Sequence, residues 1–329
     1  MPSARKDIRL VPGKQTYLAM KDMKASIIIN NYNYDAYLAS CIKSAIHQTY
    51  STVEVVVVDD GSSDNSRDTI ERFGHQVQGV FKDNSGQASA LNAGFTACTG
   101  DIVCFLDADD LFQKDKVSQI VQCFRQFPEI DWCFHPLAYI DPEGRPHPYQ
   151  NQRISSAIWD LRAQIVTAQS LPYIPTATSG MCFSRRLLEQ MLPMPDELKI
   201  TSDNYLKFAA LALSKGYFES TPLACQRLHE SNAYTNRADQ AELKATVSVS
   251  VAWALRSRFP SLEKFADGLF IRGLGIYART GISSPQAWLE IQRYFKGMRP
   301  LRRINVLLRT ISCTLKNPEN VKWRRITYG

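Results

Sequence analysis

The sequence has no apolar run near the ~18 residues that a membrane-spanning helix needs. Its start, MPSARKDIRLVPGKQ, lacks the apolar core of a signal peptide. The eight cysteines include no C-x-x-C spacing, which argues against a zinc site or a disulfide framework. Together these absences predict a cytoplasmic protein whose cysteines are reduced and mostly buried.

Acidic residues are scarce at the C-terminus. The chain has a net charge of +7, but ten Lys or Arg and a single acid, Glu319, lie between Arg293 and Gly329. That segment therefore carries about +9 and the rest of the chain about −2. Because no known nucleic-acid-binding motif accompanies the basic charge, we expect no nucleic-acid partner.

The first half alternates apolar, β-branched runs with segments of helical periodicity. The predicted strands are 24–30, 53–58, 77–82 and 102–106. The predicted helices between and after them are 35–49, 62–73, 88–98 and 114–127. This order predicts an α/β fold with a Rossmann-like, mostly parallel, doubly wound sheet.

The domain organisation follows from a change of pattern after residue 237. We expect an N-terminal extension at 1–23, a catalytic domain at 24–237 with halves 24–111 and 112–237, and a helical, basic region at 238–329. Helices are predicted in that region at 240–258, 262–280, 285–296 and 301–315.

Polar clusters follow three of the predicted strands, namely NNYN at 30–33, DDGSS at 59–63 and DADD at 107–110. In a doubly wound sheet the carboxyl ends of the strands face one ligand crevice. Asp107 and Asp109 point the same way along a strand, and two such carboxylates repel each other unless a cation is present. Mg²⁺ or Mn²⁺ with one or two carboxylates and substrate phosphates fits this pattern. The alternative is a solvated acidic turn.

Three segments carry a family resemblance: ASIIINNYN, SAIHQTYSTVEVVVVDDGSSDNS and NSGQASALNAGFTACTGDIVCFLDADD. Together they cover about 25–111 and resemble the family 2 glycosyltransferases, which have the GT-A fold. The resemblance implies transfer of a hexose from a nucleoside-diphosphate sugar, UDP above all, to an acceptor hydroxyl with inversion. A divalent metal, a saccharide or lipid-linked acceptor, and a role in polysaccharide, glycolipid or cell-envelope glycan synthesis are implied as well. The chain departs from the family at Asn30, where many members carry Pro, and at Ser89, near a frequent Arg or Lys.

The resemblance also implies roles at the base end of the site. Asp60 would accept the N3–H of uracil, and Asp59 would be structural, the alternative being that either caps the next helix. Asn30 would line the base pocket and Tyr32 would stack on the base.

Further roles concern the segment between the base pocket and the metal. Gly86 and Gly94 would relieve crowding near the nucleotide, with a plain turn as the alternative. Asn92 would hydrogen-bond the loop that carries the D-x-D. Asp107 would contact the ribose or the metal, and Asp109 the metal. Asp110 is interpreted as an acid at a helix start.

The second half is expected to supply the catalytic base. ITSDNYLKFAALALSKGYF, at 200–218, predicts a helix and then a strand, and SGMCFSRRLLEQM, at 179–191, a strand and then a helix. The family opens the first of these helices with Glu-Asp, which is Ser202-Asp203 here, so Asp203 is the candidate general base. We expect the helix dipole to lower its pKa, and an N-cap without chemistry is the alternative.

CQRLHESNAY, at 225–234, resembles the family's R-x-H-x-x-S run. By this resemblance His229 is a candidate metal ligand, and Arg227 or Arg237 a candidate contact of the diphosphate.

Two functions of other classes stay open. A phosphatase or phosphotransferase would use Asp107 as nucleophile and Asp109 as acid. A nucleotide-sugar-binding module without turnover is favoured by the departures at Ser202 and Ser89.

The last predicted helix groups apolar residues with Arg302, Arg303 and Arg309. Its apolar positions are Ile304, Leu307, Leu308 and Ile311. It is interpreted as a basic amphipathic helix that lies at the inner face of the cell membrane, where the protein would be peripheral. The alternative is a helix packed on the catalytic domain with a solvated basic face.

Overall fold

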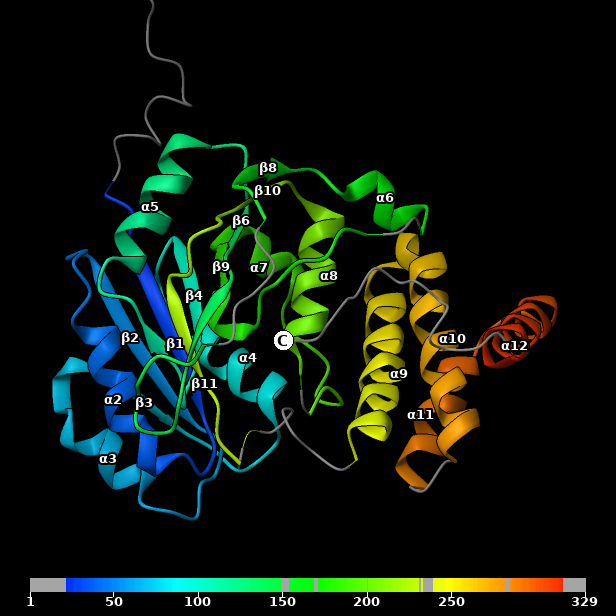
Figure 1. Cartoon of the computed structure of the whole chain (residues 1–329), viewed down its shortest axis with the longest axis horizontal. Coiled ribbons are helices and arrows are strands. Elements are labelled where there is room, and N and C mark those ends of the chain that lie inside the picture. Colours follow the sequence, from blue (N-terminus) through cyan, green and yellow to red (C-terminus); the bar gives the residue numbers. More distant parts are fainter. Residues whose placement is uncertain are drawn as a thin grey trace, which may run out of the picture.

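The computed structural model describes residues 22–148, 154–168, 171–199, 201–230, 232, 239–281 and 285–315. Its centre is an eight-stranded sheet in the order β3-β2-β1-β4-β9-β6-β10-β8 (Figure 1). β3, β2, β1 and β4 are parallel to one another, β9 runs antiparallel between β4 and β6, and β10 is parallel to β6. The predicted α/β class with a mostly parallel sheet is confirmed.

The elements of the first half match the expected order. The strands are β1 (Ala25–Asn31), β2 (Val53–Asp59), β3 (Gln78–Phe81) and β4 (Ile102–Asp107). The helices are α2 (Asp35–Ile46), α3 (Ser66–Arg72), α4 (Gln87–Ala97) and α5 (Lys116–Gln126). The start expected at 62 is wrong, because Ser62 bonds the Asp59 carboxylate and Ser63 the Asn33 side chain in a loop before α3.

The alternation of side chains along β1 divides the core between the two faces of the sheet. Ile27 and Ile29 pack with residues of α2 and α5, whereas Ile28 packs on the other face with α4. Both faces of this strand are buried, which explains its continuous apolar run. Gly94 brings α4 close to the sheet, since a Cβ there would lie 2.4 Å from Cγ2 of Ile28.

The second half adds strands and helices beyond β4. The strands of the main sheet are β6 (Trp132–Phe134), β8 (Ala157–Trp159), β9 (Met181–Ser184) and β10 (Gly216–Phe218). A second sheet has the order β5-β11-β7 and consists of β5 (Leu111–Phe112), β11 (Ala224–Arg227) and β7 (Leu137–Ile140). The helices are α6 (Arg162–Val166), α7 (Arg185–Met191) and α8 (Asp203–Leu213).

The C-terminal helices are α9 (Gln240–Arg258), α10 (Glu263–Thr280), α11 (Pro285–Phe295) and α12 (Pro300–Leu315), close to the predicted ranges. They share a hydrophobic core with α8, in which Tyr205 stacks on Phe259 and Phe208 meets Phe265 edge-on. The division of the chain at 23, 111 and 237 stays a prediction.

The structure also describes two features expected from the composition, the length and polarity of the helices and the state of the cysteines. None of the helices in the described ranges is both long and apolar enough to span a membrane. The cysteines at 41, 98, 104, 123, 133, 182 and 225 form no disulfide, and all of these except Cys225 are buried.

Candidate active site

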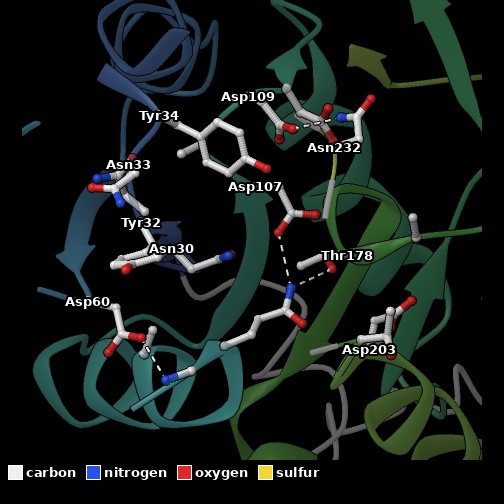
Figure 2. Close-up of a pocket in the computed structure, with 18 of the residues that line it drawn as sticks. Asn30, Tyr32, Asn33, Tyr34, Asp60, Asp107, Asp109, Thr178, Asp203 and Asn232 are labelled. Atoms are coloured by element: carbon white, nitrogen blue, oxygen red, sulfur yellow. Dashed lines mark hydrogen bonds between the residues drawn. The ribbon is translucent and has the colours of Figure 1, made fainter. Parts of the chain in front are cut away.

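A cleft of about 680 Å³ opens at the carboxyl ends of β1, β2 and β4. The predicted site residues that line it are Asn30, Tyr32, Asp60, Gly86, Asp107, Asp109 and Asp203. Figure 2 shows Asp60, Tyr32 and Asn30 at one side, Asp203 at the other, and Asp107 between them. The volume is within the ~300–1,000 Å³ of small-molecule sites.

Asp60 is buried at one end of this cleft, just after β2. Its carboxylate accepts hydrogen bonds from the backbone amides of Ser85 and Gly86 and forms an ion pair with Lys82 at 2.5 Å. A carboxylate has about four acceptor positions, so these bonds fix its orientation and leave room for another donor. Tyr32 also lines the cleft and is 47% exposed.

Asp59 is structural. It accepts hydrogen bonds from the Asn31 amide and the Ser62 hydroxyl, which tie β1 to the loop after β2. Asp59 is not among the residues that line the cleft. The two adjacent acids therefore have different surroundings.

Asp107 ends β4, opposite Asn30 in the ladder with β1. Burial and then the charge of Asp109 raise the pKa of Asp107 to about 7, against hydrogen bonds from Asn30 and Thr178. A cation in the cleft would favour the ionised form of Asp107, because it offsets both the burial and the charge of Asp109.

Two side chains of the loop after β11 contact the Asp109 carboxylate. Its Oδ2 lies 3.0 Å from Nε2 of His229 and 3.1 Å from Nδ2 of Asn232. The His229 ring is buried against Tyr34 and Tyr37. His229 thus contacts Asp109 but does not itself line the cleft, and its role as a metal ligand stays a prediction.

Asp110 does not begin a helix, and that interpretation is wrong. It precedes β5 and is buried, accepting hydrogen bonds from the Ser179 hydroxyl at 2.6 Å and the Arg227 amide at 3.0 Å. Burial raises the pKa of Asp110 well above its ordinary value. The residue ties the D-x-D turn to both sheets.

Arg227 is placed under the D-x-D turn and not in the cleft. Its guanidinium donates to the carbonyl oxygens of Asp109, Asp141 and Pro142 and stacks over the Tyr37 ring. It is 4% exposed and absent from the residues that line the cleft. The diphosphate contact expected of Arg227 does not fit this placement, because the side chain is buried and its Nε and Nη1 groups already donate to backbone carbonyls. Arg237 lies outside the described residues.

Asn92 does not reach the D-x-D loop, and that expectation is wrong. Its amide makes two hydrogen bonds of 2.8 Å with the backbone of Met194, one to the carbonyl and one from the amide N–H. Gly94 likewise meets Ile28 of the sheet and does not lie at the cleft. Gly86, by contrast, lines the cleft with φ +92°, and a Cβ there would meet the Lys199 backbone at 2.8 Å.

Asp203 is the first residue of α8 and is joined to the D-x-D strand through Gln87. The Gln87 amide donates to Oδ1 of Asp107 at 3.3 Å, and its Oε1 accepts from the amide and hydroxyl of Ser202. Ser202, which stands where the family has Glu, therefore couples α8 to α4. Gln87 went unnoticed in the sequence, although its position directly after Gly86 was an available signal.

The pKa expected for Asp203 was wrong in direction. Burial raises the pKa of this carboxyl, and the charge of Lys207 one turn on lowers it only in part. Its Oδ1 is buried without a hydrogen-bond partner. An acid of this kind is a stronger base, when ionised, than a solvated aspartate.

The donor set at the end of β4 fits a hard divalent cation. Asp107 and Asp109 offer carboxylate oxygens to the same cleft. Among the described residues no three His, Cys, Asp or Glu side chains form a group that could hold an ion by themselves. One or two carboxylates completed by substrate phosphates is the arrangement that Mg²⁺ commonly takes.

Comparisons with known proteins point to one family. Residues 26–191 match the model of the family "Glycosyl transferase family 2". An uncharacterized glycosyltransferase of Nostoc sp. is 31% identical over 290 residues, covering 86% of each chain. An uncharacterized glycosyltransferase of Rickettsia typhi is 27% identical over 66% of this chain and 68% of its own.

Among solved structures, S. aureus TarS 1-349 in complex with UDP-GlcNAc has a TM-score of 0.59 at 17% identity, covering 83% of this chain and 80% of that one. This similarity shows a shared fold. The family match and the relative that spans most of both chains show more: the protein belongs to the family 2 glycosyltransferases and has their GT-A fold.

Proposed function

We propose that this glycosyltransferase moves a hexose from a UDP-sugar to an acceptor hydroxyl, with inversion at C1 and with Mn²⁺ or Mg²⁺ bound. The acceptor is a saccharide or lipid-linked saccharide of a polysaccharide, glycolipid or cell-envelope glycan. The observation that carries the proposal is the convergence of Asp60, the Asp107–Asp109 pair and Asp203 on one cleft. Their order across it follows that of base, diphosphate and acceptor in an extended donor complex.

The base end supports a uracil. Asp60 is an acceptor held rigidly by two backbone amides, so it favours a base that presents an N–H donor. Uracil has such a donor at N3, as guanine has at N1, whereas cytosine and adenine present acceptor nitrogens at the corresponding position. Tyr32 offers a ring face for stacking.

The metal end rests on Asp109 with Asp107. When bound, the ion would supply Lewis-acid stabilisation of the leaving diphosphate. His229 and Asn232 hold the Asp109 carboxylate toward the cleft. Asn30, Gln87 and Thr178 hold Asp107, so that neither carboxylate needs to reorganise on binding.

The transfer step assigns one proton to Asp203. The acceptor oxygen forms a bond to C1 as Asp203 takes its proton. The bond from C1 to the diphosphate oxygen breaks with its electron pair, which leaves on the nucleoside diphosphate. Because one base is available and the other cleft acids are committed elsewhere, a single displacement with inversion is the simplest course.

Lys199 supports charge balance at this site in place of Arg227. It is the one Lys or Arg among the described residues that line the cleft, and its side chain is exposed. Its Nζ lies 2.8 Å from the Ser85 carbonyl. We propose that this cation turns to a bound phosphate, which would offset the absence of a basic residue at Ser89.

The test of the proposal is a donor screen with released UDP as the readout. We expect hydrolysis or transfer from UDP-sugars with Mn²⁺, and a loss of about 10²–10⁴-fold in kcat for Asp203→Asn with donor affinity retained. Asp196→Asn is a matched control at an acid that does not line the cleft, and it should behave as the wild type.

The same screen separates the two alternatives. Release of phosphate from monoesters, dependent on Asp107, would indicate a phosphotransferase and contradict the proposal. UDP binding without turnover, with no difference between the wild type and Asp203→Asn, would indicate a binding module.

A further inference from the structure

Helix α12 exposes its apolar side. Six large aliphatic side chains are between 47% and 83% exposed: Leu301, Ile304, Leu307, Leu308, Ile311 and Leu315. Their spacing of mostly three and four residues puts them in one row along the helix. The row from Leu301 to Leu315 is ~21 Å long at 1.5 Å per residue.

The opposite, more polar side of α12 contacts the protein. Val306 and Thr310 are buried there, and Arg302 forms ion pairs with Asp267 and Glu263 of α10. Figure 1 shows α12 at the outer edge of the molecule, beyond α10 and far from the sheet. The helix is thus folded onto the protein by its polar side, and its apolar row takes no part in the described fold.

Such a row is not ordinary surface. Single exposed leucines need no explanation, but a contiguous apolar patch marks an interaction site. Trp288 and Leu289 of the neighbouring helix α11 are also exposed, at 53% and 57%. The exposed apolar groups therefore gather at the C-terminal end of the fold.

The charge of α12 indicates which partner covers its apolar row. The segment 299–315 contains Arg299, Arg302, Arg303 and Arg309 and no acid. Arg303 and Arg309 are exposed, and helical geometry puts them on opposite flanks of the apolar row. An anionic surface is complementary to this pattern.

A second copy of the chain fits less well. Two such helices face to face would bring their arginines together with no acid to balance them. The face of one helix of this length is also small against the ~1,200–2,000 Å² that a stable interface buries.

We propose that α12 lies flat on an anionic lipid bilayer, with its aliphatic row at the boundary of headgroups and acyl chains and Arg303 and Arg309 among the headgroups. The contact involves neither the cleft nor its acids. It is therefore independent of the donor, the metal and the reaction proposed above.

The test is flotation of the full chain with vesicles of phosphatidylglycerol and phosphatidylcholine, compared with phosphatidylcholine alone. We expect binding to the anionic vesicles that weakens as salt is raised. The triple change Ile304→Ser, Leu308→Ser and Ile311→Ser should lower the partition coefficient at least ~tenfold. Arg309→Gln should lower it about fivefold on anionic vesicles only.

Ile158→Ser is the matched control, since Ile158 is 39% exposed on β8. It should bind as the wild type, and the thermal stabilisation of every variant by UDP should be unchanged. Absence of vesicle binding, or equal binding by the triple variant, would overturn the proposal. So would light scattering that shows a dimer which the triple variant dissociates, because a second copy would then occupy the row.

Discussion

At the scale of single residues, the surroundings of Asp203 lower the stability of the folded protein but favour catalysis by this side chain. Burial raises the pKa of its carboxyl, and its Oδ1 has no hydrogen-bond partner. A buried carboxylate oxygen without a hydrogen bond destabilises the folded protein when the acid is ionised. The raised pKa also makes the ionised carboxylate a stronger base toward the proton of an acceptor hydroxyl.

The pH dependence of transfer follows from this shift. Asp203 must be ionised to act as a base, so activity should rise with pH as its carboxyl loses a proton. Because the folded pKa is raised, this acid limb should lie above ~3.9, the ordinary value for Asp. Lys207→Met removes the charge that lowers the pKa, and it should move the limb to still higher pH.

The measurement is a pH profile of kcat for the wild type, Lys207→Met and the exposed control Lys264→Met. The control should have the wild-type profile. A limb that stays in place in Lys207→Met would show that another group sets it.

The sequence predicted the acids of the cleft and missed their partners. Asp60, Asp107 and Asp109 could be placed because the ends of neighbouring parallel strands converge whatever the loops do. Thr178 and Asn232 could not, because a hydrogen-bond partner depends on the path of distant segments. The same limitation explains Arg227, whose donors are taken by carbonyls of the β4–β5 turn and the loop after β7.

At the scale of elements, the closeness of α4 to the sheet positions Gly86 and Gln87 at the cleft. Gly94 permits that approach, because its hydrogen faces Ile28 and Val58. A methyl group there would lie 2.4 Å from Cγ2 of Ile28, on a central strand that cannot yield easily.

Gly94→Ala should therefore destabilise the fold by ~1–3 kcal/mol through overpacking, despite the better helix propensity of Ala. Gly268→Ala in α10 is the matched control, since a Cβ there meets nothing within 4 Å. It should be neutral or stabilising by up to ~1 kcal/mol. Urea denaturation followed by circular dichroism compares the two, and equal midpoints would contradict the packing argument.

The periodicity of the sequence predicted which segments are helices and which are strands, but it did not predict where all of them begin and end. The range predicted for α9 was met at both ends, since its pattern is long. α3 starts four residues late because Ser62 and Ser63 bond the loop side chains of Asp59 and Asn33. β5 went unpredicted, because two residues are too short a run to show a period.

At the scale of the whole molecule, the C-terminal helices continue the hydrophobic core of the sheet region and do not have a separate core. Residues of α8, α9 and α10 belong to one apolar cluster with residues of β1, β2 and β4. α8 thus has two roles, since it carries Asp203 at its start and anchors the helical region along its length. Helix α12, which carries the exposed Arg303 and Arg309, lies at the outer edge of that region, far from the sheet (Figure 1).

A divalent cation at Asp107 and Asp109 should bind together with the diphosphate of UDP. Titration calorimetry with UDP, in Mn²⁺ and then in EDTA, tests it most directly on the wild type and Asp109→Ala. We expect the wild type to bind UDP much more tightly with Mn²⁺, and Asp109→Ala to lose this difference while it unfolds at a similar temperature. Equal affinity for UDP in Mn²⁺ and EDTA, or an undiminished effect of Mn²⁺ in Asp109→Ala, would contradict it.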